Sequence, residues 1–346
     1  MMIRDHDIPY AHSEYDISVT NGSQDALAKA FEMLLNPGDE IFVEIPTYSG
    51  ALAFLKPLQP KFVGVRVDDE GLDPKHLEQL LIERAREGKP IPKALYTIPT
   101  GQNPSGCSTT VERKRQVYAL AQKYNFLVLE DDPYFHLQFG RAPAPLDTTS
   151  YVTPPQESYL SMDVDGRVLR FDSFSKILSA GMRIGFISGP KSFIQQLNLS
   201  SQVTNIQASG IPQAMIAKLL QVWGHEGWER HVRETKLFYL RRRDYYLSKV
   251  EQHLSGLVRY TVPDAGMFVW FEVLGLNTTA KELIQTKAVD AKVLMLPGES
   301  FLTAPPQGVF VRSCFSTATD EEIDEALFRF GELIRNERAA QAKLAE

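Results

Sequence analysis

The lysine at position 176 stands in a segment whose neighbours have side chains suited to chemistry. It follows Val168–Phe171, an apolar run that predicts a buried strand, and ligands of α/β proteins gather at the carboxyl ends of such strands. Partial burial there would lower the pKa of the Lys176 amine toward that of a nucleophile, which favours Schiff-base chemistry. Ser173, Ser175 and Arg183 supply hydroxyls and a guanidinium suited to phosphate oxygens. A solvated surface lysine is the ordinary alternative, and these neighbours argue against it.

A second group of residues, from Thr20 to Asp25, opens a predicted helix with a glycine and a hydroxyl. Gly22, Ser23 and Gln24 would place backbone N–H groups and the positive helix end against an anion such as a phosphate. Ser23 acting as a plain N-cap explains the same pattern. Taken alone, the pattern leaves both interpretations open.

Three acids, Glu130, Asp131 and Asp132, end a predicted apolar strand, and Pro133 and Tyr134 follow. Acids at the end of a buried strand are costly unless a cation lies near them. A protonated pyridine nitrogen would be such a cation, and pairing it with an aspartate keeps the ring electron-withdrawing, as carbanion stabilisation requires. Metal binding is the competing use of the acids. We expect no metal, because no histidine shares the cluster in suitable spacing and successive strand residues point to opposite faces.

Three further residues could reach a ring or a carboxylate. Asn103 lies in the turn-forming loop Thr97–Gly106 and could donate its amide to a ring oxygen, with a purely structural turn as the alternative. Tyr48 could lay its face on a flat heteroaromatic ring, although a core position is the commoner fate of a tyrosine. Arg312 leaves a short predicted strand and could bind a carboxylate bidentately, whereas alone it would be interpreted as a surface arginine.

Short apolar runs that alternate with segments of helical period must position these residues. The predicted strands, buried on both faces, are Glu40–Ile45, Ala94–Ile98, Phe126–Leu129, Val168–Phe171 and Ile184–Ile187. Gln24–Leu35 and Thr109–Tyr124 predict helices that link strands. The polar stretch Ser158–Gly166 predicts a surface insertion. The expected fold is α/β, with a mainly parallel central sheet sandwiched by helices.

A smaller α+β lobe is expected at the C-terminal end. We place the domain boundary at residue 223, which gives a large domain of residues 1–222 and a small domain of residues 223–346. Trp223–Leu254 is highly charged yet keeps an apolar stripe, as a long half-exposed helix would. The later elements are strands Met267–Val273, Val293–Leu296 and Val309–Arg312 and a terminal helix from Asp320.

The composition restricts the class of protein. Of the 346 residues, 43% are hydrophobic and 23% are charged, as in ordinary globular proteins. A net charge of -6 offers no basic face for nucleic acid. The two cysteines, Cys107 and Cys314, form neither a disulfide framework nor a repeated metal-ligand pair. Because Met1–Asp7 is polar and no stretch approaches the ~18 apolar residues of a membrane span, we expect a cytoplasmic protein without membrane or nucleic-acid partners.

Taken together, these residues resemble the class I and II aminotransferases, which are fold-type-I pyridoxal phosphate enzymes. The most similar branch is that of the fungal aromatic amino acid aminotransferases and the kynurenine/2-aminoadipate aminotransferases. The resemblance runs from about Ile17 nearly to the end of the chain. Its most specific pieces, in family order, are Thr100–Pro104, Glu130–Tyr134 and Asp172–Ile177 with Gly181–Gly185.

The resemblance implies a role for each candidate residue toward pyridoxal 5'-phosphate. Lys176 would form a Schiff base with the cofactor, Asp131 would pair with the pyridine nitrogen, and Tyr48 would stack on the ring. Asn103 and Tyr134 would contact the ring hydroxyl oxygen. The residues that would hold or orient the phosphate are Gly22, Ser23, Gln24, Ser173, Ser175 and Arg183. Arg312 would bind the α-carboxylate of the substrate, and Asn103 would also face the substrate.

The activity implied by the resemblance is transfer of an amino group to a 2-oxo acid such as 2-oxoglutarate, by a ping-pong mechanism in a homodimer. The donor would be an aromatic amino acid, kynurenine or 2-aminoadipate. Relatives carry a long segment ahead of the phosphate loop, whereas Gly22 comes almost at once in this sequence. That segment supplies part of the small lobe, residues that close over the substrate, and a tyrosine that reaches the partner's phosphate. We therefore expect these parts to be missing.

Other functions remain open from the sequence. A truncated, weakly active or non-catalytic paralogue would keep the cofactor, and a lyase or cyclopropane-forming synthase of the same fold would change the reaction. A regulator that binds the cofactor without turnover is disfavoured, because the basic helix-turn-helix domain of such proteins is not visible.

Overall fold

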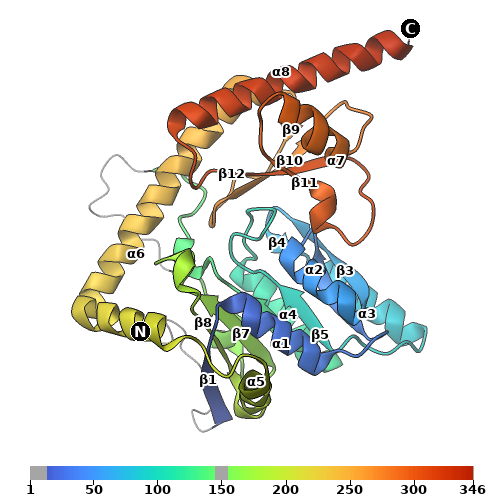
Figure 1. Ribbon diagram of the computed structural model, residues 1–346. Helices are drawn as coiled ribbons and strands as arrows, with labels where there is room; N and C mark the ends of the chain where they lie inside the picture. The colour runs from blue at the N-terminus through green and yellow to red at the C-terminus, as the bar shows by residue number, and fades with distance from the viewer. Residues whose placement is uncertain (1–13, 145–154, 346) are drawn as a thin grey trace.

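An eight-stranded sheet forms the centre of the larger lobe in the computed structural model, which describes residues 14–144 and 155–345 (Figure 1). In spatial order the strands are β1 (Tyr15–Thr20), β8 (Gly185–Pro190), β7 (Val168–Ser173), β6 (Leu127–Asp131), β5 (Ala94–Thr97), β2 (Glu40–Ile45), β3 (Lys61–Asp68) and β4 (Gly71–Leu72). The strands from β7 to β3 are parallel to their neighbours, while β1, β8 and β4 pair antiparallel. The predicted mainly parallel sheet is confirmed.

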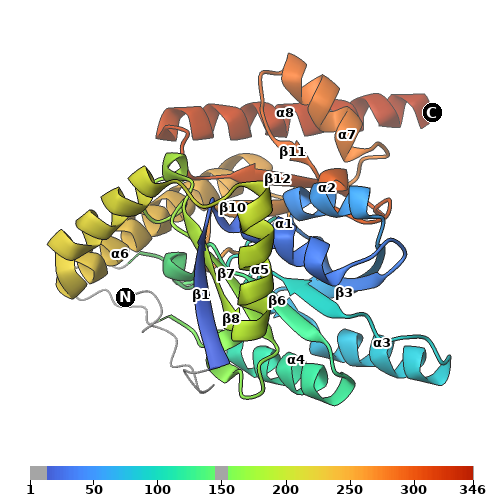
Figure 2. The ribbon, with the colours of Figure 1, turned by 60° about the horizontal axis from the view of Figure 1, so that its bottom comes forward.

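Helices cover both faces of this sheet, because successive strand residues point to opposite sides and are apolar on both. In β2, Ile41 and Val43 face a core that includes α1 (Ser23–Leu34), α2 (Ser49–Leu58) and α5 (Lys191–Thr204). Phe42 faces the opposite core with α3 (Pro74–Arg86) and α4 (Val111–Tyr124). Figure 2 shows the two helix layers on either side of the strands.

A smaller lobe follows through the long helix α6 (Gly210–Leu254), which Figure 1 shows running from the large lobe toward α8 (Asp320–Ala345). Its antiparallel sheet has the order β11 (Leu296–Pro297), β12 (Val309–Cys314), β10 (Phe268–Val273) and β9 (Val258–Arg259), and α7 (Ala280–Glu282) lies beside it. Helix α6 is interrupted at Gly224, with φ 61° and ψ −164°. The domain boundary predicted at residue 223 falls one position before this interruption.

Two of the sequence predictions about these elements are wrong. Of the strand expected at Val293–Leu296, only Leu296 pairs in the sheet, because Val293 to Met295 lead out of the preceding turn without strand partners. Ser158–Gly166 is not a surface insertion, since Tyr159 and Leu160 are fully buried. Their backbone N–H groups donate to the carboxylate of Glu130 at 2.9 and 3.0 Å, which holds the segment against the sheet.

The sequence did not predict the edge strands β1 and β4, the strand β3 next to β4, or the helices α2, α3 and α5. The polar stretch Met1–Asp7, which contributes to the expectation of a cytoplasmic protein, lies outside the described residues. Within those residues, no helix is both long and apolar enough to cross a membrane.

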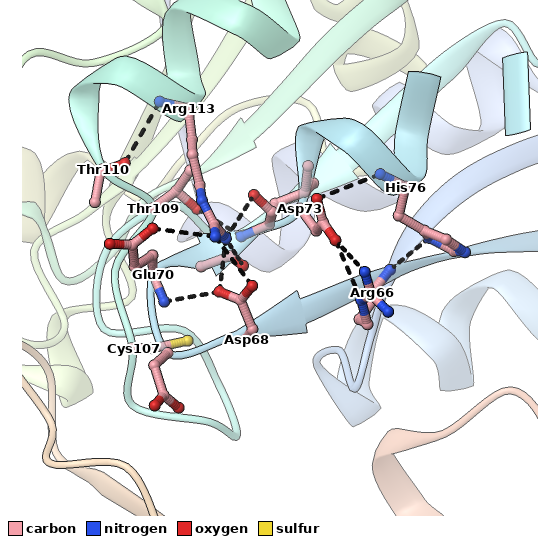
Figure 3. Close-up of polar contacts among 12 residues, drawn as sticks. Arg66, Asp68, Glu70, Asp73, His76, Cys107, Thr109, Thr110 and Arg113 are labelled. Carbon is pink, nitrogen blue, oxygen red and sulfur yellow. Dashed lines mark hydrogen bonds and ion pairs between the residues drawn. The ribbon is translucent and has the colours of Figure 1, made fainter. Parts of the chain in front are cut away.

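A polar corner fastens the start of α4 to the turn between β3 and β4 (Figure 3). The guanidinium of Arg113 donates to both carboxylate oxygens of Asp68, at 2.6 and 3.0 Å, and lies 3.1 Å from the carboxylate of Glu70. The hydroxyl of Thr109 accepts from the N–H of Leu72 at 3.2 Å, and the N–H of Thr109 donates to the carbonyl of Pro99 at 2.8 Å. This corner therefore fixes both ends of the loop that contains Asn103.

Gly71 in this corner offers a test of the close packing. Its φ of +88° disfavours any Cβ, and an added Cβ would also overlap the backbone of Thr109. Gly38 has nearly the same φ, +86°, with nothing within 4 Å of the added atom, and is the matched control. We expect Gly71→Ala to lower the free energy of unfolding by about 2–5 kcal/mol and Gly38→Ala by only about 1–2 kcal/mol, measured by urea titration. Equal losses would contradict the packing described here.

Candidate active site

One cavity of about 310 Å³ is lined by nearly all the site residues that the sequence predicts. It lies where the carboxyl ends of the central strands, the start of α1 and the small-lobe strands β10 and β12 meet. The lining residues are Ser23, Gln24, Tyr48, Ile98, Asn103, Asp131, Pro133, Tyr134, Ser173, Ser175, Lys176, Ala180, Arg183, Phe268 and Arg312. Of the predicted site residues only Gly22 is absent from this lining, and it is the N-cap directly before Ser23.

Asp131 carries a buried oxygen that lacks a partner. Its Oδ2 accepts from the hydroxyl of Tyr96 at 2.7 Å, whereas its Oδ1 has no hydrogen-bond partner among the described residues. Burial, helped by the negative charges of Asp132 and Asp172, raises the pKa of Asp131 to about 7, although the hydrogen bond from Tyr96 and the charge of Arg170 lower it. The cavity therefore presents a carboxyl group whose ionised form needs a cation.

The acids on either side of Asp131 have a cation of their own in Arg170. Its guanidinium is fully buried and lies 3.0 Å from Glu130, 3.2 Å from Asp132 and 3.0 Å from Asp172. Arg170 is the register partner of Glu130 on the neighbouring parallel strand, which explains the pairing. The sequence reasoning missed Arg170, although a basic residue inside the apolar run Val168–Phe171 was the available signal.

The start of α1 is suited to an anion. The helix begins at Ser23 with Gly22 as N-cap, at φ 91°, and no side chain caps it. The alternative in which Ser23 is a plain N-cap is therefore wrong. A Cβ on Gly22 would lie 2.5 Å from Nη2 of Arg183, so only glycine lets that guanidinium lie across the helix start. Arg183 donates to the Ser175 hydroxyl at 3.1 Å, which adds hydroxyl and guanidinium donors to the helix N-terminus.

Lys176 is half-buried in a single helical turn that follows β7. In this turn the N–H of Leu178 donates to the carbonyl of Phe174 at 2.9 Å. Desolvation lowers the pKa of Lys176 below its usual range, and the guanidiniums of Arg183 and Arg312 act in the same direction, while Cys314 opposes them. The shift has the direction that the sequence predicts and increases the fraction of neutral, nucleophilic amine.

Arg312 reaches the cavity from β12 of the small lobe. Its Nη1 donates to Oδ1 of Asn103 at 2.9 Å, and its guanidinium centre lies 4.2 Å from the ring of Phe268 and 4.9 Å from that of Phe301. Tyr134 meets Phe268 edge to face at 6.0 Å. Arg312 is thus held between aromatic rings and an amide, with donors left for an anionic ligand. The surface-arginine alternative is excluded.

Glu44 anchors the loop that contains Asn103 through hydrogen bonds, and the sequence analysis did not predict this role. This buried carboxyl accepts from the Thr97 hydroxyl at 2.5 Å, from the N–H of Ile98 at 3.1 Å and from Nε2 of Gln102 at 3.0 Å. Burial raises its pKa to about 7. Gln102 stands next to Asn103, so the network sets the position from which Asn103 meets Arg312. In the part of the chain described, no group of three His, Cys, Asp or Glu could hold a metal ion.

Comparisons with known proteins agree on one family. A family model described as "Aminotransferase class I and II" matches residues 6–330. The chain is 44% identical over 331 residues to the rat protein "Kynurenine/alpha-aminoadipate aminotransferase, mitochondrial", covering 93% of this chain and 74% of that protein.

Two solved structures have the same fold over nearly all of the chain. The aromatic aminotransferase Aro9 from C. albicans superposes with a TM-score of 0.88 and 33% identity, covering 98% of this chain and 77% of that one. The Pyrococcus horikoshii kynurenine aminotransferase, in complex with PMP, KYN as substrates and KYA as products, superposes with a TM-score of 0.86 and 32% identity. The match covers 97% of this chain and 78% of that one.

The burial of Asp131 predicts that the stability of the chain without cofactor, here called the free chain, depends on pH. Its pKa rises from 3.8 to about 7 on folding, so the unfolded chain loses this proton first as the pH rises. The carboxyl therefore destabilises the fold progressively between about pH 4 and pH 7. We expect Asp131→Asn, which can still accept from Tyr96, to stabilise the free chain by roughly 1–4 kcal/mol at pH 8 and by much less at pH 5. Urea unfolding at both values measures this, and a loss of stability at pH 8 would contradict it.

Proposed function

We propose that this chain, which belongs to the class I and II aminotransferase family, moves an amino group from an aromatic amino acid, kynurenine or 2-aminoadipate to a 2-oxo acid such as 2-oxoglutarate. The observation that supports this is one cavity in which the half-buried Lys176 lies together with the start of α1 and with an oxygen of Asp131 that has no partner among the described residues. The names of the rat, C. albicans and P. horikoshii proteins support the donor class.

The cofactor of the family, pyridoxal 5'-phosphate, fits the side chains that line the cavity. Its protonated pyridine nitrogen would be the cation that Oδ1 of Asp131 lacks. Lys176 would hold it covalently, Tyr48 would lie against its ring, and Asn103 and Tyr134 would contact its hydroxyl oxygen. The donors for its phosphate would be the helix start at Gly22, Ser23 and Gln24, together with Ser173, Ser175 and Arg183. When bound, it supplies an electron-withdrawing ring that stores the electrons released at Cα of the substrate.

Arg312 would bind the α-carboxylate of the substrate. Guanidinium and carboxylate form a bidentate, charge-assisted pair, and Asn103 already fixes one edge of this guanidinium at 2.9 Å. Phe268 and Phe301 flank it and exclude water, which strengthens the pair. The α-carboxylate held in this way would fix the orientation of the Cα–H bond relative to the lysine.

Lys176 would take the proton from Cα of the substrate and return it at the end of the transfer. Its lowered pKa favours the neutral amine that a general base requires. The reaction would proceed in two halves, with the first oxo acid leaving before 2-oxoglutarate enters, which gives ping-pong kinetics. We also propose a cytoplasmic location, because both cysteines, Cys107 and Cys314, are free thiols, as is usual in a reducing compartment. The rat relative, by contrast, is named as mitochondrial.

A half-reaction tests the proposed activity directly. We expect an aromatic amino acid alone to convert the bound cofactor from its aldehyde form to its amine form, and 2-oxoglutarate to reverse the change, both followed by absorbance. Lys176→Ala should slow the conversion by about 10²-fold or more, because the general base is lost. Lys191→Ala, at an exposed lysine outside the cavity, is the control and should leave it unchanged.

The spectrum also separates the competing functions. A lyase would release product and leave the cofactor as the aldehyde, and a non-catalytic paralogue would bind the cofactor without any spectral change. Either result with the purified chain would refute the proposed transamination.

We further propose that the functional unit is a homodimer joined through the end of α5 and the start of α6. Six large apolar side chains are exposed there: Leu199, Val203, Ile206, Ile211, Met215 and Val222. Exposed apolar patches of this kind mark interaction surfaces, because burying them is favourable. A second copy of this chain is the partner that the family resemblance implies.

The dimer proposal is tested by charge substitution on this patch. Val203, 84% exposed, and Leu344, 88% exposed near the end of α8, have similar exposure but lie on different elements. We expect Val203→Asp combined with Ile211→Asp to shift the chain from dimer to monomer in sedimentation velocity, while Leu344→Asp does not. A wild-type chain that sediments as a monomer at micromolar concentration would overturn the proposal.

A further inference from the structure

The helix that joins the two lobes contacts the candidate site at two points. Helix α6 leaves the large lobe, is interrupted at Gly224 and continues to the small lobe (Figure 1). Shortly after the interruption, the ring of His231 reaches the turn that carries Lys176. One turn earlier, Trp228 reaches the short helix Phe135–Leu137 that follows Tyr134.

The first contact is a hydrogen bond to the residue next to Lys176. Nε2 of His231 lies 2.6 Å from the carbonyl oxygen of Ile177. Because a carbonyl oxygen only accepts, Nε2 carries the proton in this bond. The half-buried position of His231 limits the competition from water for this carbonyl.

This bond completes the attachment of the Lys176 turn. At its beginning, the N–H of Phe174 donates to the carbonyl of Ile184 at 3.1 Å, and the carbonyl of Phe174 accepts from Leu178 at 2.9 Å and from Ser179 at 3.2 Å. These bonds fix the start of the turn to the large lobe. After Lys176, the bond from His231 to the Ile177 carbonyl fixes the backbone to α6, so the lysine lies between two anchors.

Aromatic packing holds the His231 ring in place. The ring of Trp223, before the interruption in α6, lies 4.8 Å from that of His231, and the buried Trp228 lies 6.3 Å from it. On its other side Trp228 meets the buried ring of His136 edge to face at 5.3 Å. Burial lowers the pKa of His136 to about 3, so this ring packs as a neutral group.

We propose that His231 is a positioning residue, which orients Lys176 by fixing the Ile177 carbonyl to the interlobe helix. It touches neither substrate nor cofactor and acts through the backbone beside the lysine. The inference deepens the proposed function, on which the catalytic consequence rests, while the attachment itself is a property of the free chain. Without the bond, the turn loses its second anchor and the amine of Lys176 samples more orientations.

Hydrogen–deuterium exchange of the cofactor-free chain tests the attachment. His231→Phe keeps an aromatic ring but removes the donor, and we expect the amides of Leu178 and Ser179 to exchange about fivefold faster. His231→Gln places an amide nitrogen near the position of Nε2 and should restore wild-type exchange. His231→Asn is too short to reach the carbonyl and should exchange as fast as the phenylalanine variant, which keeps the test open if that variant fails to fold.

The same helix provides a matched control in His253. Its Nε2 makes a bond of the same length, 2.6 Å, to Asp324, and its ring packs edge to face on Phe328 at 5.7 Å. His253→Phe removes a half-buried histidine donor from α6 without touching the Lys176 turn. We expect exchange between Ser173 and Arg183 to stay at the wild-type rate in this variant.

The second test measures the kinetics of the chain with its cofactor bound. We expect His231→Phe to reduce the rate of the amino-acid half-reaction roughly tenfold, with KM for the amino acid nearly unchanged, because Arg312 still binds the carboxylate. Equal exchange in the His231→Phe and His253→Phe variants, or failure of His231→Gln to restore the wild-type pattern, would overturn the inference. The exchange arm needs no turnover, so a chain that does not transaminate would refute the proposed function without affecting this test.

Discussion

The ion cluster around Arg170 is the constraint on which the candidate site depends. Three carboxylates, from Glu130, Asp132 and Asp172, are buried near the carboxyl ends of β6 and β7. The guanidinium of Arg170 pairs with all three. Removing one partner of a buried pair typically costs about 3–5 kcal/mol, because the other charge is left without compensation. The cluster therefore fixes the relative register of the two strands whose carboxyl ends carry Asp131 and the Lys176 turn.

Asp131 differs from its neighbours Glu130 and Asp132 because these two pair with Arg170 and Asp131 does not. Residues alternate along a strand, so Glu130 and Asp132 point toward Arg170 while Asp131 between them faces the cavity. One oxygen of Asp131 is satisfied by Tyr96, and the other is left without a partner among the described residues. A buried group that lacks a partner costs stability, and such a cost is expected where a ligand completes the site.

The parts of the fold that the sequence predicts are those set by local pattern. Glu40–Ile45 is apolar on both faces and its bounds match β2, whereas the strand β3 consists mostly of exposed and half-buried residues and gives no such signal. The two site residues with the clearest signal lie at the carboxyl ends of buried strands, since Asp131 ends β6 and Lys176 is in the turn after β7. Glu44 was missed because its partners are distant in sequence, and it contacts Gln102 across 58 positions. Arg170 was missed because a single charge in an apolar run does not indicate its partners on the neighbouring strand. Ser158–Gly166 was mistaken for a surface insertion for the same reason, since the carboxylate that buries it belongs to Glu130.

Contacts that are distant in sequence also explain why the site needs both lobes. Lys176 and Asp131 come from the large lobe, but the guanidinium of Arg312 comes from β12 and meets Asn103 across 209 positions. The strand β10 supplies Phe268, which packs on Arg312 and on Tyr134. The small lobe thus contributes the carboxylate-binding group together with one of its walls. Because α6 is the covalent link between the lobes and also contacts the lysine turn through His231, the orientation of the small lobe and that of Lys176 are set by the same helix.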